Sequence, residues 1–207
     1  MTWVTPAALL IVLATSAEVG PAARPAEPPP SSARTSTQGQ LLVATESLRD
    51  PRFAHTVVYM LRHDATGALG LVVNRPVTTL SLERILESLG RDHEGARGDI
   101  RVHYGGPVES GRGFVLHTGE WMTDESQVVQ GGVAVTSDPK VFEALARGAG
   151  PRRVLFAVGY AGWVPGQLEA EIEGGFWIAV NADEALIFDD DAGTKWERAT
   201  QRRRLTL

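Results

Sequence analysis

Residues 159–177 read GYAGWVPGQLEAEIEGGFW. They follow the apolar run VLFAV at residues 154–158, so the pattern predicts a buried strand, a turn built from glycine, a short helix and then a new strand. Pro165 suits the first position of that helix, and Leu168 and Ile172, four residues apart, give it one apolar face. The segment therefore predicts a chain that mixes strands with short helices.

The same segment is a candidate binding site. Tyr160 and Trp163 stand in the predicted turn, and Gln167 and Glu171 share one face of the predicted helix. A turn from a strand into a helix leaves backbone N–H groups unpaired, and many proteins place a ligand there. The carboxylates of this helix would repel a phosphate. The alternative interpretation is that the acidic residues only form a solvated helix face.

Composition limits the classes of protein to which the chain can belong. It has 207 residues, of which 43% are hydrophobic, enough for one domain with a hydrophobic core. A net charge of -5 provides no global field that would attract nucleic acid or an anionic membrane, so direct binding to nucleic acid is not expected. The absence of cysteine excludes a disulfide, a thiolate metal site and a cysteine nucleophile.

The first residues of the chain differ in composition from the rest. Residues 1–20 contain an apolar stretch with a small-residue end, which favours a signal peptide or an N-terminal tether, and the stretch is too short to be a transmembrane domain. Residues 21–38 are rich in Pro, Ala and Ser and are predicted to be a disordered linker. We therefore expect a single domain at 39–207. The chain would be periplasmic or exported if the signal peptide acts, and cytoplasmic otherwise.

Periodicity along the domain predicts more strands than helices, joined mostly by hairpin-length loops, and hence an α+β fold. Helices are predicted at 82–89, where Ser81 can cap the start, and from Pro139 to Gly148. Other strands are predicted at 40–45, 56–61, 68–74, 100–104, 113–117, 127–129, 133–136, 176–180 and 185–188.

The sequence contains no established catalytic or metal-binding motif. It lacks the nucleophile elbow Gly-x-Ser-x-Gly and the zinc motif His-Glu-x-x-His, and the glycine-rich residues 106–113 lack the Lys-Ser/Thr pair of a phosphate loop. His103 and His117 flank the turn at Gly105 and Gly106 and could face each other, but no third ligand is evident. Neither a metal nor a cofactor is expected.

Asn74 and Arg75 lie at the predicted end of a strand, just before Pro76. An amide and a guanidinium in this position could hold a carboxylate or a phosphate. The alternative is that the proline ends the strand while Asn74 bonds the backbone of the turn.

Several blocks of sequence, taken in order, resemble the bacterial YqgE/AlgH family. They span the chain from residue 39 to about residue 196. The blocks are GQLLVA at 39–44, DPRF at 50–53, GALGLVVNRP at 67–76, GGPV at 105–108, VLH at 115–117 and GYAGWVPGQLEAEI at 159–172.

That resemblance implies an α+β fold with a mixed, largely antiparallel, bifurcated sheet that is curled into a pseudo-barrel with a few short helices. Members of the family are commonly labelled transcriptional regulators, and the family supplies no catalytic residues to carry over. The chain departs from the family pattern at Glu46, where a proline is usual, and at Gly175, where an asparagine is usual.

Three functions follow as hypotheses. We favour a non-enzymatic binding or regulatory domain that recognises a small molecule or a protein. The alternative is a hydrolase-type enzyme that uses Glu169 or Glu171 as a base, which requires His117 or His63 within about 8 Å of that carboxylate. Direct DNA binding is the least favoured. The candidate ligand-binding residues are Asn74, Arg75, Gly105, Gly106, His117, Tyr160, Trp163, Gln167 and Glu171.

Overall fold

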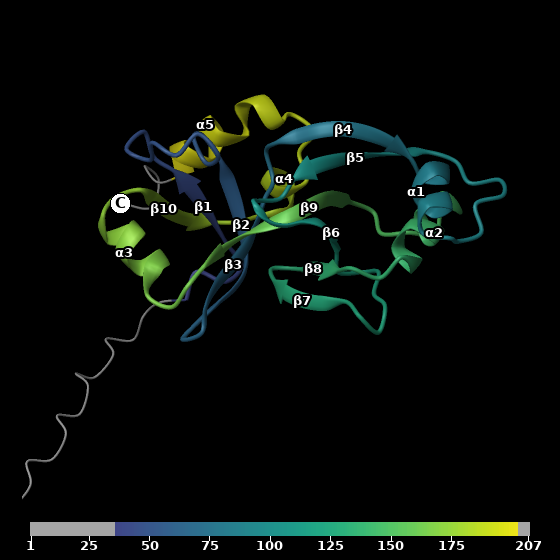
Figure 1. The fold of residues 1–207 in the computed structure, drawn as a ribbon, viewed down its shortest axis with the longest axis horizontal. Helices are drawn as coiled ribbons and strands as arrows, with labels where there is room; N and C mark the ends of the chain where they lie inside the picture. The colour runs from purple at the N-terminus through teal and green to yellow at the C-terminus, as the bar shows by residue number, and fades with distance from the viewer. Residues whose placement is uncertain (1–35, 203–207) are drawn as a thin grey trace, which may run out of the picture. The chain divides into compact units, whose positions relative to one another are not determined.

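A computed structural model describes residues 36–202 (Figure 1). The predictions for residues 1–35 lie outside this part of the chain. The described elements are β1 (Gln40–Ala44), β2 (Val57–Asp64), β3 (Gly67–Val72), β4 (Pro76–Ser81), α1 (Leu82–Ser88), β5 (Asp99–Tyr104), β6 (Val108–Thr118), β7 (Gln127–Gln130), β8 (Val133–Thr136), α2 (Lys140–Ala146), β9 (Val154–Trp163), α3 (Gln167–Glu173), β10 (Trp177–Asn181), α4 (Glu184–Ile187) and α5 (Ala192–Arg202).

The strands form one sheet that forks at β9 (Figure 1). One path runs β10-β1-β2-β3-β9-β6-β8-β7, while β5 pairs with β9 from outside this path and carries β4 with it. Among the described strand pairs only β5 and β9 are parallel. The sheet curls into a half-barrel with several short helices, so the predicted α+β fold class is confirmed.

Glycines make the fork possible. Gly105 lies between the two branches, where it accepts a hydrogen bond from the N–H of Val72 (2.9 Å) and donates one to the carbonyl of Val158 (2.8 Å). A Cβ atom at Gly105 would overlap the carbonyl oxygen of Gly159, and one at Gly106 would overlap the backbone of Tyr160. The two chain segments can therefore approach this closely only because these positions lack side chains.

Several details differ from the sequence predictions, among them strand β4 at Pro76–Ser81, which was not predicted. The glycine-rich residues 159–163 continue strand β9 instead of turning, and Gly159 allows the close approach to Gly106. Residues 184–187 form helix α4, not a strand, because the Asp183 carboxylate caps the start by accepting from the N–H of Leu186 (2.7 Å). His103 and His117 do not face each other, since β9 lies between β5 and β6.

The core consists of three clusters of buried side chains. The largest lies between the curled sheet and helices α4 and α5 and includes Leu71, Leu116 and Ile187. The second lies under α3 and contains Trp163 and Trp177, and the third lies under α1 and α2. Among the described residues, no helix combines the length and the apolar character needed to cross a membrane.

Lys195 is a buried cation in this core. Its side chain is 0% exposed, and its ammonium group donates to the carbonyls of Val73 (2.9 Å) and Ile187 (2.8 Å). The lysine thus ties α5 to the end of α4 and to the residue that follows β3. Burial lowers the pKa of Lys195 from 10.5 to about 8, because the charged form loses its hydration.

The fork predicts a severe effect of Gly106→Ala. The added methyl group would overlap the backbone of Tyr160, so we expect a loss of about 3 kcal/mol in the free energy of unfolding. Gly111→Ala is the matched control, because nothing lies within 4 Å of a Cβ atom at Gly111, and its effect should stay within about 0.5 kcal/mol. Urea unfolding measures both. Equal stability of the two variants would contradict this account of the fork.

Lys195 predicts a stability that rises with pH between 8 and 10. In that range the unfolded chain still holds the proton that the folded lysine has lost, so each pH unit adds up to about 1.4 kcal/mol to the free energy of unfolding. Tyr59, whose pKa burial raises from 10.0 to about 12, acts in the opposite direction only above pH 10. Urea midpoints at pH 8.0 and about 9.5 should show the rise, and Lys195→Met should remove it. Lys140→Met, the control at an exposed lysine, should keep it.

Candidate functional site

Trp163, Gln167 and Glu171, together with Trp177, form a hydrogen-bonded group, called here the helix-side cluster, in which the tryptophans are buried and Gln167 is exposed. The Glu171 carboxylate accepts from the indole N–H groups of Trp163 and Trp177, both at 2.8 Å, and from the side-chain amide of Gln167, also at 2.8 Å. The oxygen of that amide accepts from the N–H of Val164 (3.2 Å). The structure therefore brings Trp163, Gln167 and Glu171 together, as predicted, but their polar atoms bind one another.

Asn74 and Arg75 hold the loop between β1 and β2. The Asn74 amide accepts from the N–H of Val57 (2.9 Å) and donates to the carbonyl of His55 (2.9 Å). The Arg75 guanidinium donates to the carbonyls of Arg52 (2.6 Å) and Ala54 (2.8 Å). This arrangement agrees with the alternative in which Asn74 bonds the backbone of a turn.

His117 is buried on β6, away from the helix-side cluster. Burial lowers its pKa, so the neutral imidazole is favoured. Its Nδ1 lies 3.1 Å from the carbonyl of Thr118, which can only accept, so Nδ1 carries the proton. Nε2 then accepts from the hydroxyl of Ser126 at 3.3 Å. His103 is also buried, and in the described part of the chain no group of three or more His, Asp or Glu residues is arranged to hold a metal.

One carboxylate and one histidine satisfy the distance required by the hydrolase hypothesis. Nε2 of His63 lies 3.7 Å from a carboxylate oxygen of Glu169. Nδ1 of the same ring accepts from the N–H of Thr37 (3.1 Å), so Nε2 carries the proton that faces the carboxylate. Thr37 and Gln38 belong to the predicted linker, and here Thr37 is buried against His63.

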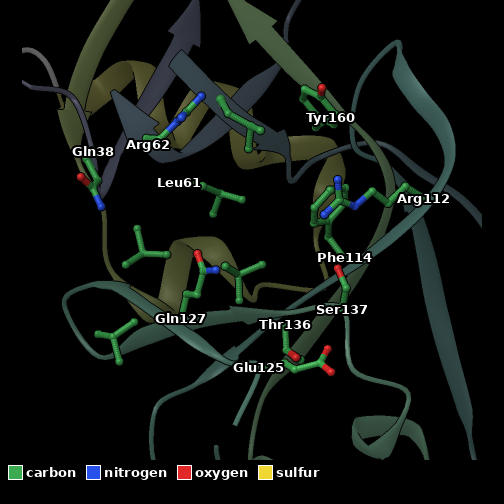
Figure 2. A pocket seen from close by; sticks show the side chains of 14 residues that line it. Gln38, Leu61, Arg62, Arg112, Phe114, Glu125, Gln127, Thr136, Ser137 and Tyr160 are labelled. Carbon is green, nitrogen blue, oxygen red and sulfur yellow. The ribbon is translucent and has the colours of Figure 1, made fainter. Parts of the chain in front are cut away.

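A cleft of about 580 Å³ lies between the β7–β8 hairpin and the β2–β3 hairpin, and Tyr160 is the one predicted site residue that lines it (Figure 2). Its floor is continuous with the largest core cluster through Leu61, Val129 and Tyr160. The lining residues are Gln38, Leu61, Arg62, Leu69, Arg112, Phe114, Glu125, Gln127, Val128, Val129, Val135, Thr136, Ser137 and Tyr160.

Two β-bulges shape the cleft. Successive side chains of a regular strand point to opposite faces, yet the consecutive residues Leu61 and Arg62 both line the cleft. Leu61 is an extra residue in β2, since Met60 pairs with Gly70 and Arg62 with Leu69. Val129 is likewise an extra residue in β7. Bulges re-aim side chains in this way and are common near functional sites.

Cations outnumber anions in the lining. Arg62 and Arg112 are half-exposed, and Glu125 is the one carboxylate among the described residues that lines the cleft. Arg62 also lies 3.8 Å from the carboxylate of Asp64, outside the lining. Arg112 lies over the ring of Phe114, with 4.9 Å from its guanidinium carbon to the ring centroid, and bonds the Glu109 carboxylate at 3.1 Å. The arginines retain further N–H donors, since each guanidinium has five.

Of the residues that line the cleft, the sequence predicted only Tyr160 as a site residue. The lining comes from six strands and from adjoining loops, and no single segment among them shows a motif. The two bulges depend on pairing between strands, which hydrophobic alternation in one strand does not reveal.

The helix-side cluster predicts a large effect of Glu171→Ala. Removing the carboxylate leaves two indole N–H groups of buried tryptophans without an acceptor, so we expect a loss of about 3 kcal/mol in the free energy of unfolding. Glu173→Ala, at an exposed position on the same helix, is the control and should change it by less than about 0.5 kcal/mol. Urea unfolding measures the free energy of unfolding of both variants. A Glu171→Ala variant as stable as Glu173→Ala would contradict the role given to the Glu171 carboxylate.

The chain is similar to several bacterial proteins. A model of the AlgH-like family matches residues 41–207. A UPF0301 protein of Cereibacter sphaeroides is 46% identical over 159 residues, which cover 76% of this chain and 86% of the relative. A UPF0301 protein of Bradyrhizobium diazoefficiens is 37% identical over 196 residues, with 91% and 92% covered.

Two solved structures share the fold. The solution structure of the AlgH protein from Pseudomonas aeruginosa matches with a TM-score of 0.68 at 37% identity and covers 83% of this chain and 91% of that chain. A crystal structure of a Corynebacterium diphtheriae protein matches with a TM-score of 0.63 at 19% identity, over 80% of this chain and 86% of that chain, and shows a common fold alone. The resemblance found in the sequence blocks is thus confirmed, and the chain belongs to the AlgH-like family.

Proposed function

We propose that the chain is a non-enzymatic binding domain whose ligand occupies the cleft between the β7–β8 and β2–β3 hairpins. The observation that supports this proposal is the cleft itself, about 580 Å³ in volume, with an apolar floor and guanidinium groups among its lining. Ligand sites of proteins commonly have this size and combine apolar walls with a few polar groups that orient the ligand.

The ligand is an organic anion with an apolar body. Leu61, Val129 and Phe114 offer apolar contacts, while Arg62 and Arg112 offer charge-assisted hydrogen bonds to a carboxylate or a phosphate. Each arginine also contacts a carboxylate, Arg62 that of Asp64 at 3.8 Å and Arg112 that of Glu109 at 3.1 Å, so the ligand would bond the remaining N–H groups of the guanidiniums. The partner is a small molecule or a segment of a protein, and a regulatory role would follow from its binding.

Tyr160 is the predicted residue that touches this ligand. Gly106 lies against the backbone of Tyr160, and Gly105 lies against that of Gly159. The helix-side cluster joins α3 to β9 and β10, and Asn74 with Arg75 holds the loop between β1 and β2. Direct ligand contacts by these other residues and by His117 stay a prediction.

The hydrolase alternative rests on the pair formed by Glu169 and His63, which does not line the cleft. We favour binding over catalysis because the N–H and the hydroxyl of Thr37 occupy Nδ1 of His63, and Thr37 is itself buried. Direct DNA binding is not expected from the acidic net charge.

Thermal melting of the full chain with organic carboxylates, organic phosphates, acidic peptides, sugars, nucleotides and metals tests the proposal. At a hundred times its Kd, a ligand stabilises the fold by about 2.7 kcal/mol, a rise in melting temperature of roughly 5 to 10 °C. We expect such a rise with an anionic compound, and its loss in Arg62→Ala and Arg112→Ala.

Arg97→Ala is the matched control, because Arg97 is exposed in the loop before β5 and does not line the cleft. It should keep the rise in melting temperature. If the rise survives in both cleft variants but is lost in Asn74→Ala or Gln167→Ala, the site lies instead at the loop that Asn74 holds or at the helix-side cluster. If none of the anionic compounds shifts the melting temperature, the proposal is wrong.

A further inference from the structure

Strand β7 has a free edge. Within residues 36–202 it pairs only with β8, so its other side presents backbone N–H and C=O groups that no strand uses. Strand β7 reads QVVQ, without the charged residues or proline that often protect such an edge, but it is short and carries the bulge at Val129, and both features restrict pairing to a few residues. Val128, in the middle of this edge, is 65% exposed. The edge is therefore chemically suited to accept another strand.

The free edge borders the cleft, and the cleft suits the side chains of an extended segment. Gln127, Val128 and Val129 of β7 all line it, and Leu61 lies across from them on β2 (Figure 2). Alternate side chains of a strand added to β7 would point toward the apolar floor, and those between them would point to solvent. The amides of Gln38 and Gln127 lie in the same cleft and can bond a peptide backbone.

The free edge of β7 is blocked at the Gln130 end, which limits the length of a strand that could add to it. The side chain of Gln130 fills the space where Gly39 lacks a Cβ atom, and the hydroxyl of Tyr59 donates to the carbonyl of Gln130 (3.3 Å). The free part of the edge is therefore Gln127–Val129, about 10 Å at the rise of a strand. A segment of a few residues fits this length.

The charged groups of the cleft indicate which chemical group the added segment carries. Arg62 and Arg112 lie along the cleft, and Glu125 is the one acidic group that lines it. We propose that the cleft receives a short extended peptide that carries a carboxylate and adds to the free edge of β7 as a further strand. The inference rests on the proposed function and names the class of ligand. The carboxylate belongs either to an acidic side chain or to the C-terminus of the peptide, two sources with the same chemistry.

Selection from two random hexapeptide libraries on the full chain tests the inference, one library with free carboxyl ends and one with amidated ends. We expect enriched peptides that alternate apolar residues and carry a carboxylate. Enrichment from the free-end library alone would identify the terminal carboxylate, and acidic residues enriched in the amidated library would identify a side chain. N-methylation of alternate amides in an enriched peptide should weaken binding at least about tenfold, because it removes the donors that pair with β7 while keeping the side chains.

A pair of valine variants locates the peptide on the protein. Val128→Glu places a negative charge on the free edge and should weaken binding of the enriched peptide at least about tenfold. Val77→Glu is the matched control and should not change the affinity, since Val77 is 60% exposed on β4, which among the described strands pairs only with β5. Thermal melting of both variants confirms that they fold.

Three outcomes would overturn the inference. The first is that no peptide is enriched. If a small organic anion still raises the melting temperature, and Arg62→Ala and Arg112→Ala remove that rise, the proposed function holds although the inference about a peptide fails. The second is enriched peptides that tolerate N-methylation. The third is a concentration-dependent dimer in sedimentation that Val128→Glu abolishes, because the free edge would then pair with a second copy of the chain.

Discussion

Strand β9 has to hydrogen-bond with three other strands, and the rest of the structure depends on how it does so. Its first half lies between β5 and β6, and its second half pairs with β3. At the point of exchange the loop after β5 approaches β9 so closely that only glycine fits at positions 105 and 106. The curl of the sheet, and with it the separation of the hairpins that border the cleft, follows from this fork.

Polar residues that suggest a ligand site in the sequence form hydrogen bonds with other groups of the same chain. A buried N–H group without an acceptor costs free energy comparable to a lost hydrogen bond, so the indole groups of Trp163 and Trp177 need the Glu171 carboxylate. The loop between β1 and β2 has carbonyls that need donors, and the guanidinium of Arg75 supplies them. A cluster of amides, acids and aromatics near glycine-rich segments is therefore weak evidence for a ligand.

The sequence predicted what local patterns determine. Helix α1 has the predicted cap, since Ser81 accepts from the N–H of Arg84, and the α+β class follows from the many short strands. The extension of β9 to Trp163 could not be predicted, because it depends on glycines at 105–106, far away in the sequence. The cleft could not be predicted either, because it is assembled from many segments and two bulges. Tyr160 was predicted as an aromatic residue of a turn; it lies instead on β9, beside Gly106, and lines the cleft.

That position of Tyr160 connects the stability of the fold to the function we propose. Its backbone is fixed by Gly106, and its ring packs edge-on against Phe114, with 6.0 Å between the ring centroids. One wall of the cleft is therefore ordered before any ligand arrives, and little conformational entropy remains to be lost there on binding. The edge of β7 on the other side has no strand partner within the described residues. A rigid wall that faces an unpaired edge is an arrangement suited to holding an extended segment, because the segment supplies the missing hydrogen bonds while the wall fixes its side chains.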